Sequence, residues 1–257
     1  MATPDANNLY LGAGELWVNR MTNGALGLWR HLGNVSRFEM TTTVETLEKQ
    51  SSMEGARGTL KEVPTKTTME IGLTLDEFDP ENLALALFGS VSAYSQSSGT
   101  ATDTSLGTNN SKKGYWLDTG KKKITVTAVK VGATTHTLGT DYTVDSETGM
   151  IYITPNSTIV DGSTVLWSGS YAAITSTQIQ ALADAKIECA LQFRSASDAT
   201  GPRFLCDVWK AAIQPDGALS MLTEQFGEIT LKGKVLADTS KPVGQRYYRK
   251  IVLPVTN

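Results

Sequence analysis

The sequence has little of the chemistry on which most active sites depend. Its 257 residues include 2 cysteines and 2 histidines. His31 and His136 lie far apart in the chain, and neither has neighbours at the spacing of a zinc site, so we expect exposed loop histidines. Two cysteines exclude a disulfide framework, and Cys189 and Cys206 are therefore expected to be small, reduced core residues.

Long apolar runs and an excess of positive charge are also missing. No stretch of about 18 apolar residues occurs, and the first residues lack the basic leader and apolar run of a signal peptide. We therefore expect no membrane contact and a chain that is made and kept in the cytosol. The formal net charge of -3 argues against tight binding to nucleic-acid phosphates, which needs clustered lysine and arginine.

Sequence motifs of the common enzyme classes are absent as well. The chain contains neither a GxxxxGK(S/T) phosphate-binding loop nor a GxSxG nucleophile elbow. The GAG at residues 12–14 lacks the preceding strand and the third glycine of a dinucleotide fingerprint. The sequence therefore predicts a protein that is not an enzyme, with no catalytic, cofactor-binding or metal-ligating residues and no cofactor.

What the chain does contain is one clear helix signal, at about residues 79–88, in the segment DPENLALALFG. Asp79 can cap this helix, Pro80 suits its first turn and Gly89 can end it. Its leucines predict burial against a sheet or a partner. Four acidic residues lie around its start: Asp76, Glu77, Asp79 and Glu81. Because the helix dipole stabilises carboxylates at this end, we interpret them as helix-start residues and not as a catalytic pair.

Apolar and polar residues alternate along several other segments, as in strands with one buried face. These segments are 35–45, 66–75, 187–194, 204–208 and 229–235. A polar connection of about 20 residues, 46–66, joins the first two and is too long for a tight hairpin turn. It is either a mobile surface loop or an arm that contacts a neighbouring subunit.

The segments 187–194 and 204–208 are expected to form one long hairpin with its tip near Ser197 and Asp198. In that register three pairs lie directly opposite each other: Ile187 and Val208, Cys189 and Cys206, Leu191 and Phe204. The two cysteines would then be cross-strand neighbours in the core.

The composition also predicts how the chain is divided. Residues 90–113 are rich in serine, threonine, glycine and asparagine, which predicts a flexible boundary. Beyond it, short strand-like segments with a turn at Ser146–Gly149 predict a small inserted β-sandwich module, residues 114–171. The remaining residues, 1–113 and 172–257, would form the two parts of one β-rich core.

Taken in order, five segments resemble the major tail tube proteins of siphophages, the long-tailed bacteriophages with non-contractile tails. They are GNVSRFEMTTTVETLEKQSSMEGARGTLKEV, LTLDEFDPENLALALFG, DYTVDSETGMIYI, AKIECALQF and GEITLKGKVLAD. The resemblance implies a mainly β fold, a tail-tube-type β-sandwich or barrel with one short flanking helix and an inserted β module. Strands of neighbouring subunits would join into one continuous inner β-barrel within a ring.

This resemblance further implies a structural virion protein that polymerises as stacked hexameric rings into the tail tube, a hydrophilic conduit for genome ejection. It would be made and assembled in the host bacterial cytoplasm and reside in the virion tail. Its partners would be other copies of itself, the tape measure protein, the tail terminator and the distal tail protein, with DNA only in transit.

The same resemblance gives roles to particular residues. Four glutamates on polar strand faces would line the lumen, where basic rings would hold phosphates: Glu39, Glu45, Glu70 and Glu188. Three lysines lie on comparable faces: Lys186, Lys232 and Lys234. Either they pair with these glutamates, or the assignment of residues to the two strand faces shifts by one near the strand ends. The segment 46–66 would be the arm that engages the next ring, with three apolar anchors: Leu47, Met53 and Leu60.

Two other functions remain open. Another ring-forming tail component or a secretion-system tube subunit would share the physics of closed rings and would differ in polymer length. A carbohydrate-binding or adhesive β module is suggested by three aromatic residues of the insert, since exposed rings can stack on sugars: Trp116, Trp167 and Tyr171. Packing in the core is the commoner role of such residues.

Overall fold

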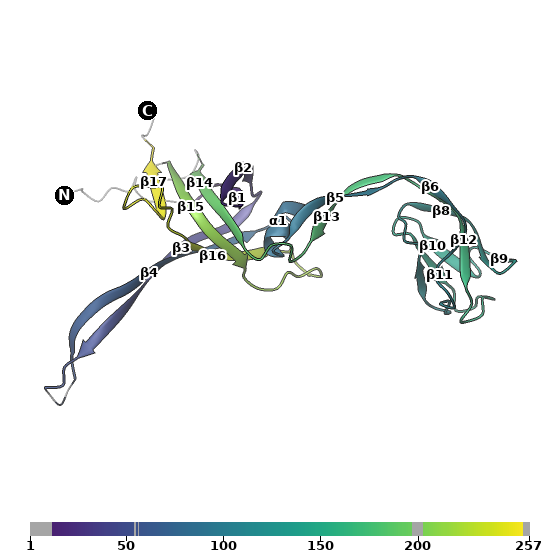
Figure 1. The fold of residues 1–257 in the computed structure, drawn as a ribbon, viewed down its shortest axis with the longest axis horizontal. Helices are drawn as coiled ribbons and strands as arrows, with labels where there is room; N and C mark the ends of the chain where they lie inside the picture. The colour runs from purple at the N-terminus through teal and green to yellow at the C-terminus, as the bar shows by residue number, and fades with distance from the viewer. Residues whose placement is uncertain (1–11, 54, 56, 197–202, 254–257) are drawn as a thin grey trace. The chain divides into compact units, whose positions relative to one another are not determined.

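The computed structural model describes residues 12–53, 55, 57–196 and 203–253 (Figure 1). The protein is mainly β, with several antiparallel sheets and, within these residues, one short helix. Residue contacts divide the chain into two compact units. The first unit combines residues 1–91 with 179–257, and the second unit is residues 92–178.

The elements of the first unit are β1 (Gly14–Thr22), β2 (Ala25–His31), β3 (Val35–Gln50), β4 (Thr59–Leu75), α1 (Pro80–Ala86), β14 (Ile187–Ser195), β15 (Phe204–Pro215), β16 (Ile229–Val235) and β17 (Tyr248–Val252). Those of the second unit are β6 (Gly99–Ser105), β7 (Trp116–Asp118), β8 (Ile124–Val131), β9 (Thr134–His136), β10 (Tyr142–Asp145), β11 (Met150–Ile153) and β12 (Val165–Tyr171). The chain enters and leaves the second unit through β5 (Ser90–Gln96) and β13 (Ile174–Gln180), which pair with each other.

An eight-stranded antiparallel sheet forms most of the first unit. Its order is β2, β1, β14, β15, β16, β4, β3, with β17 paired to the first part of β15. One face of the sheet is apolar and packs with Leu85 of α1 in a single core. The alternation predicted for three strand segments is confirmed by fully buried side chains on this face: Ile71, Leu73, Leu75, Ile187, Cys189, Leu191, Ile229 and Leu231.

The predicted start of the helix is confirmed. The Asp79 carboxylate accepts hydrogen bonds from the backbone N–H groups of Glu81 and Asn82, at 2.8 and 3.0 Å. The helix ends at Ala86, earlier than predicted, and Phe88 takes the left-handed conformation with φ of 48°. Gly89 is needed for a different reason, because a Cβ atom there would lie 2.6 Å from the carbonyl oxygen of Gln180.

The register predicted for the long hairpin is wrong. β14 and β15 do pair, but Phe193 lies opposite Cys206, and Cys189 lies opposite Ala211. The pairing shifts at an irregularity between Cys189 and Leu191, which periodicity along one strand does not reveal. The predicted tip residues, 197 and 198, lie outside the described residues. Both cysteines are buried as expected, and burial raises the pKa of the Cys189 thiol to about 12.

The polar connection 46–66 is not a loop, because β3 and β4 continue through most of it as one long hairpin. Glu45 pairs with Lys66, Leu47 with Val63, and Gln50 with Thr59. The sequence conceals these strands because neither face of the ribbon is buried, so apolar residues do not alternate with polar ones.

Two sheets enclose one apolar core in the second unit. Their orders are β10, β11, β7 and β6, β12, β8, β9. Trp167 is the largest fully buried side chain and packs in this core with Ile151 and Val165. The turn predicted at Ser146–Gly149 is confirmed, because Val144 pairs with Ile151 on the two strands that flank it.

The flexible boundary predicted for residues 90–113 is wrong over its first part, which forms β5 and β6. β6 is an edge strand held by backbone pairing with β12, so it needs few apolar side chains, and only Ala101 in it is buried. The compact second unit is accordingly larger than the predicted insert, 114–171, and runs from Ser92 to Gln178.

Candidate assembly surfaces

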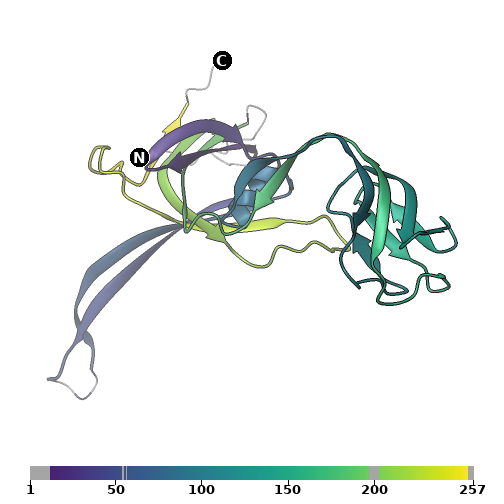
Figure 2. The same ribbon diagram turned by 45° about the vertical axis from the view of Figure 1, so that its right-hand side comes forward.

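The hairpin of β3 and β4 runs well beyond the rest of its sheet (Figures 1 and 2). β4 pairs with β16 only over Glu70–Leu75, so among the described strands residues 42–50 and 59–69 pair only with each other. We call residues 42–69 the hairpin extension. Residues 42–50 and 59–67 are exposed throughout. A two-stranded ribbon has no core of its own, so this segment contributes little to the stability of the single subunit.

Apolar side chains are exposed all along the hairpin extension. Each predicted anchor lies in it: Leu47 in β3, Met53 in the turn and Leu60 in β4. Met53 is 81% exposed, and Leu47 is 67% exposed directly opposite Val63. Such side chains gain the free energy of burial only when another surface covers them.

Polar side chains of five strands align on the face of the sheet opposite the core. One row runs across β3, β4, β16, β15 and β14 in the order Thr41, Glu70, Lys234, Ala212, Glu188. The next row is Glu39, Gly72, Lys232, Gln214. We call these two rows the polar face. The structure therefore brings Glu39, Glu70 and Glu188 to one face, while Glu45 lies farther out, in the hairpin extension.

The polar face carries charges of both signs. Glu70 lies 4.0 Å from Lys234, and Glu188 lies 2.9 Å from Lys186 and 3.0 Å from Lys210. Hydrogen bonds from these two lysines lower the pKa of the Glu188 carboxyl. Glu39 and Glu45 pair with Arg37 and Lys66, and Lys232 pairs with Asp216. Lys186 and Lys234 thus neutralise Glu188 and Glu70, two of the predicted lumen glutamates. The polar face therefore has mixed charge and is not acidic.

The strand order of the eight-stranded sheet ends at two open edges within the described chain, β2 and β3, and the short strand β17 pairs only with β15. β2 is unusually apolar for an edge strand, since Leu28 is 90% exposed and Leu26 and Trp29 are also exposed. An edge strand with free backbone donors and acceptors can pair with a strand of another chain. Both edges are therefore candidate contacts between copies.

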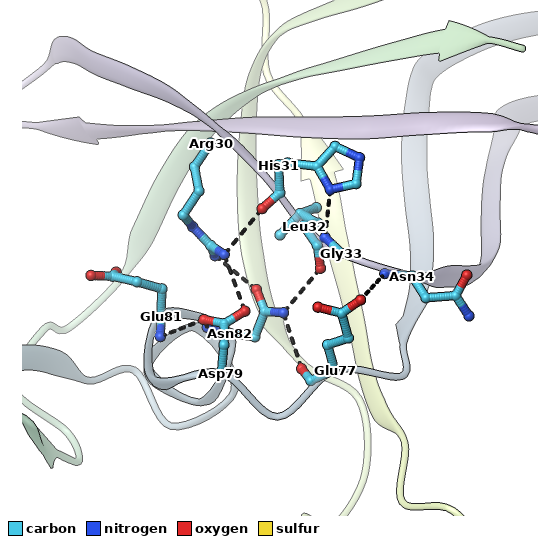
Figure 3. Close-up of polar contacts among 9 residues, drawn as sticks. All are labelled: Arg30, His31, Leu32, Gly33, Asn34, Glu77, Asp79, Glu81 and Asn82. Atoms are coloured by element: carbon cyan, nitrogen blue, oxygen red, sulfur yellow. Dashed lines mark hydrogen bonds and ion pairs between the residues drawn. The ribbon is translucent and has the colours of Figure 1, made fainter.

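The acidic residues at the helix start hold α1 against the turn between β2 and β3 (Figure 3). Arg30 of β2 donates to the side-chain oxygen of Asn82 at 2.7 Å and reaches the Asp79 carboxylate at 3.3 Å. The fully buried Asn82 amide donates to the carbonyl oxygens of Leu32 and Glu77, both at 3.0 Å. This network fixes where the β2 edge lies.

The turn itself is fitted to the Glu77 side chain (Figure 3). Glu77 accepts the N–H of Asn34 at 2.8 Å, and Nδ1 of His31 accepts the N–H of Gly33 at 2.9 Å. Gly33 has φ of 79°, and a Cβ there would lie 2.3 Å from the Glu77 carboxylate. The histidine and the carboxylates thus shape the chain between the apolar edge β2 and the start of β3.

His136 is not an exposed loop histidine, since its side chain is 6% exposed. Its Nδ1 lies 3.1 Å from the Thr158 hydroxyl and 3.6 Å from the Asp141 carboxylate. Asp141 accepts backbone N–H groups of Thr137 and Thr158, which hold the pKa of its carboxyl far below the usual range. Ser157 contacts Asp141 and not the imidazole, so the order of contacts differs from a serine hydrolase triad.

Two other features, a metal-binding cluster and a membrane-spanning helix, do not occur in the described ranges. No group of three or more histidine, cysteine or acidic side chains there could hold a metal ion. No helix in that part of the chain is long and apolar enough to cross a membrane.

The three aromatic residues proposed for sugar binding have different environments. Trp167 is buried in the core of the second unit, and the ammonium of Lys121 covers the Tyr171 ring at 4.9 Å. Trp116 is half exposed and pairs with Tyr152, with the ring centroids 5.0 Å apart. Of these three side chains, Trp116 is the one that is exposed, whereas Tyr171 is half-buried.

The sequence patterns do not predict one exposed apolar segment. Residues 216–228 connect β15 to β16, and Met221, Leu222 and Phe226 in them are 73%, 95% and 99% exposed. The only sequence signal is three large apolar residues among turn and polar residues in SMLTEQF, without a period of a strand or helix.

Comparison with models of protein families matches residues 9–249 to the family described as "Protein of unknown function UCP028589". The match includes both units and nearly the whole chain. A search of curated proteins finds no match.

Proposed function

Because the chain belongs to the family of proteins of unknown function UCP028589, its function has to be argued from its own residues, and we propose that it is a structural subunit of a siphophage tail tube. The observation that carries the proposal is the eight-stranded sheet with an open strand at each side and a long exposed hairpin. A lone subunit with these features exposes backbone and apolar surface that other copies can cover. Assembly, and not catalysis, is the proposed role.

In the proposed ring, the open edges of six copies pair and close the sheets into one inner barrel. Ring closure removes the open edges β2 and β3, as closure of a barrel does, and buries the exposed leucines of β2 between copies. The polar face then lines the lumen, with Glu39 beside Arg37 and with Glu70 and Glu188 beside their lysine partners. A hydrophilic surface of mixed charge lets DNA pass, because it offers no unneutralised ring of cations to hold the phosphates.

The hairpin extension is the proposed contact between stacked rings. Leu47, Met53 and Leu60 would each be covered by the neighbouring ring, which supplies the burial that the single subunit lacks. The surrounding threonine, glutamate and lysine side chains keep the segment soluble before assembly. The other proposed partners are the tape measure protein, the tail terminator and the distal tail protein, within a virion tail assembled in the bacterial cytoplasm.

Negative-stain electron microscopy of the purified protein over a concentration series, beside size-exclusion chromatography, tests this proposal. We expect hollow tubes or stacked rings that become more abundant with concentration, because self-association follows mass action. Single rings that never stack would favour a different ring-forming tail or secretion component. Monomers at every concentration would contradict the proposal.

A second candidate function is carbohydrate binding by the second unit, and the Trp116–Tyr152 pair is the observation that favours it. The two rings are cross-strand partners on the outer face of the sheet β10, β11, β7. Asp118 and Met150 form the next pair on that face. Asp118 is paired with Lys122 at 3.7 Å, so the exposed aromatic platform has no excess of positive charge beside it and suits a neutral sugar better than a nucleic acid.

A glycan array probed with the full-length protein and with Trp116→Ala tests this second candidate. If the platform binds sugars, the variant should lose at least tenfold in affinity for every glycan bound, with an unchanged circular dichroism spectrum. Trp29→Ala in the first unit is the matched control and should bind like the wild type. A wild-type protein that binds no glycan would eliminate this candidate.

A further inference from the structure

The exposed segment 216–228, which we call the apolar loop, is held in place at both of its ends. Leu219 packs against the core of the first unit, and the Asp216 carboxylate accepts a hydrogen bond from the Lys232 ammonium at 2.8 Å. At the other end, Gly227 lies so close to the Phe78 ring that a Cβ would be 2.7 Å from it. Leu222 and Phe226 are therefore presented to solvent by an anchored loop.

A groove of about 510 Å³ with an aromatic floor lies elsewhere on the first unit. Its rings follow one another, with centroids 5.9 Å apart between Phe38 and Phe193 and 5.7 Å apart between Phe193 and Phe204. The Lys250 ammonium lies 3.8 Å from the centroid of the Phe204 ring. The groove is large enough for a leucine and a phenylalanine side chain, and it offers them apolar contact and one cation at its rim.

The apolar loop does not occupy the groove of its own copy, since no residue of 216–228 is among those that line it. β15 begins at Phe204 and ends at Pro215, directly before the loop, and a strand of 12 residues is about 36 Å long. Leu222 is seven residues beyond Pro215, and even a fully extended segment of that length spans only about 25 Å. The chain thus keeps Leu222 away from Phe204 within one copy, whereas the loop of a second copy is free of this constraint.

We propose that Leu222 and Phe226 of one copy dock into the groove between Phe38 and Phe204 of the next copy, with Glu224 beside Lys250. This inference rests on the proposed assembly of copies and assigns a specific contact to it. The contact joins two different surfaces, so each copy offers a loop to one neighbour and a groove to another. Contacts of that kind repeat in one direction and produce a polar chain of subunits.

Charge complementarity supports a second copy as the occupant. The groove rim carries Arg37, Glu39 and Lys250, and the first two pair with each other. Within the described residues Lys250 makes no ion pair, and neither does Glu224, which lies between the two apolar residues of the loop. The docked loop thus brings one acidic and one basic side chain together at the edge of an apolar contact.

Charge exchange between two variants tests the contact. Glu224→Lys and Lys250→Glu should each raise the protein concentration needed for assembly about tenfold, because like charges meet at the contact. An equimolar mixture of the two variants should return it to within about twofold of the wild type, since each contact in an alternating chain regains opposite charges. Glu147→Lys, the same charge change in the second unit, is the control and should leave assembly unchanged.

Cross-linking gives a readout that does not depend on tubes. A mixture of Glu224→Cys and Lys250→Cys proteins treated with a short bis-maleimide should yield dimers, and neither variant should do so alone. If wild-type protein forms tubes but the mixture gives no dimers, this inference fails and the proposed function stands. If wild-type protein stays monomeric and no dimers form, both fail. A concentration-independent link within single chains of a Glu224→Cys/Lys250→Cys protein would also overturn it.

Discussion

Replacing Thr46–Thr65 by Asn-Gly is expected to give a folded, soluble subunit that forms no tubes. The new turn would be closed by the Glu45–Lys66 pair, and Asn-Gly favours the tight turn that a two-residue hairpin loop requires. Folding should survive because residues 46–50 and 59–65 are exposed and none of them belongs to the core. Assembly should fail because all three proposed anchors are removed.

Electron microscopy at the concentrations where wild-type protein assembles measures this outcome, with thermal unfolding as the check on folding. A matched variant keeps the hairpin length and changes Leu47, Met53 and Leu60 to serine. If the anchors carry the contact, the serine variant should fail as the shortened chain does. Wild-type tubes from the shortened chain would show that the hairpin extension does not join rings.

Leu85→Asp is expected to abolish folding of the first unit. Leu85 is 3% exposed in α1 and packs in the core of the eight-stranded sheet. Losing the leucine side chain and burying a carboxylate without a partner should together cost at least about 4 kcal/mol, a large part of the stability of a typical domain. Circular dichroism and limited proteolysis should report an unfolded first unit.

Leu28→Asp is the matched control for this substitution. It makes the same chemical change at a side chain that is 90% exposed, so the subunit should fold like the wild type. If β2 pairs between copies, the same control should weaken assembly by placing a charge at the seam. A stable, folded Leu85→Asp protein would mean that α1 does not belong to the core.

Sequence reasoning succeeds in this protein where one side of an element is buried. The helix cap at Asp79, the inward faces of β4 and β16, and the hairpin tip before Gly149 all follow from local pattern and turn chemistry. In each of these places a short segment contains its own signal, because burial on one side forces apolar residues to recur with the period of the element.

Sequence reasoning fails where the stability or the position of an element depends on a distant segment. β6 is a strand because β12 pairs with it, and the hairpin extension is a ribbon because β3 and β4 pair with each other while both faces stay in water. Neither case produces an apolar period. The shift at Cys189 depends on an irregularity in pairing, and the polar rows depend on the register of five strands at once. These features are decided by tertiary structure.

The pairing of β5 with β13 brings the two ends of the second unit together, and the side-chain amide of Gln178 donates to the Ser92 hydroxyl at 3.1 Å. A module whose entry and exit adjoin can be gained, lost or exchanged in one genetic step without stretching the chain on either side. The first unit can therefore keep its sheet unchanged while the module evolves separately, which makes the second unit a natural place for variation between related proteins.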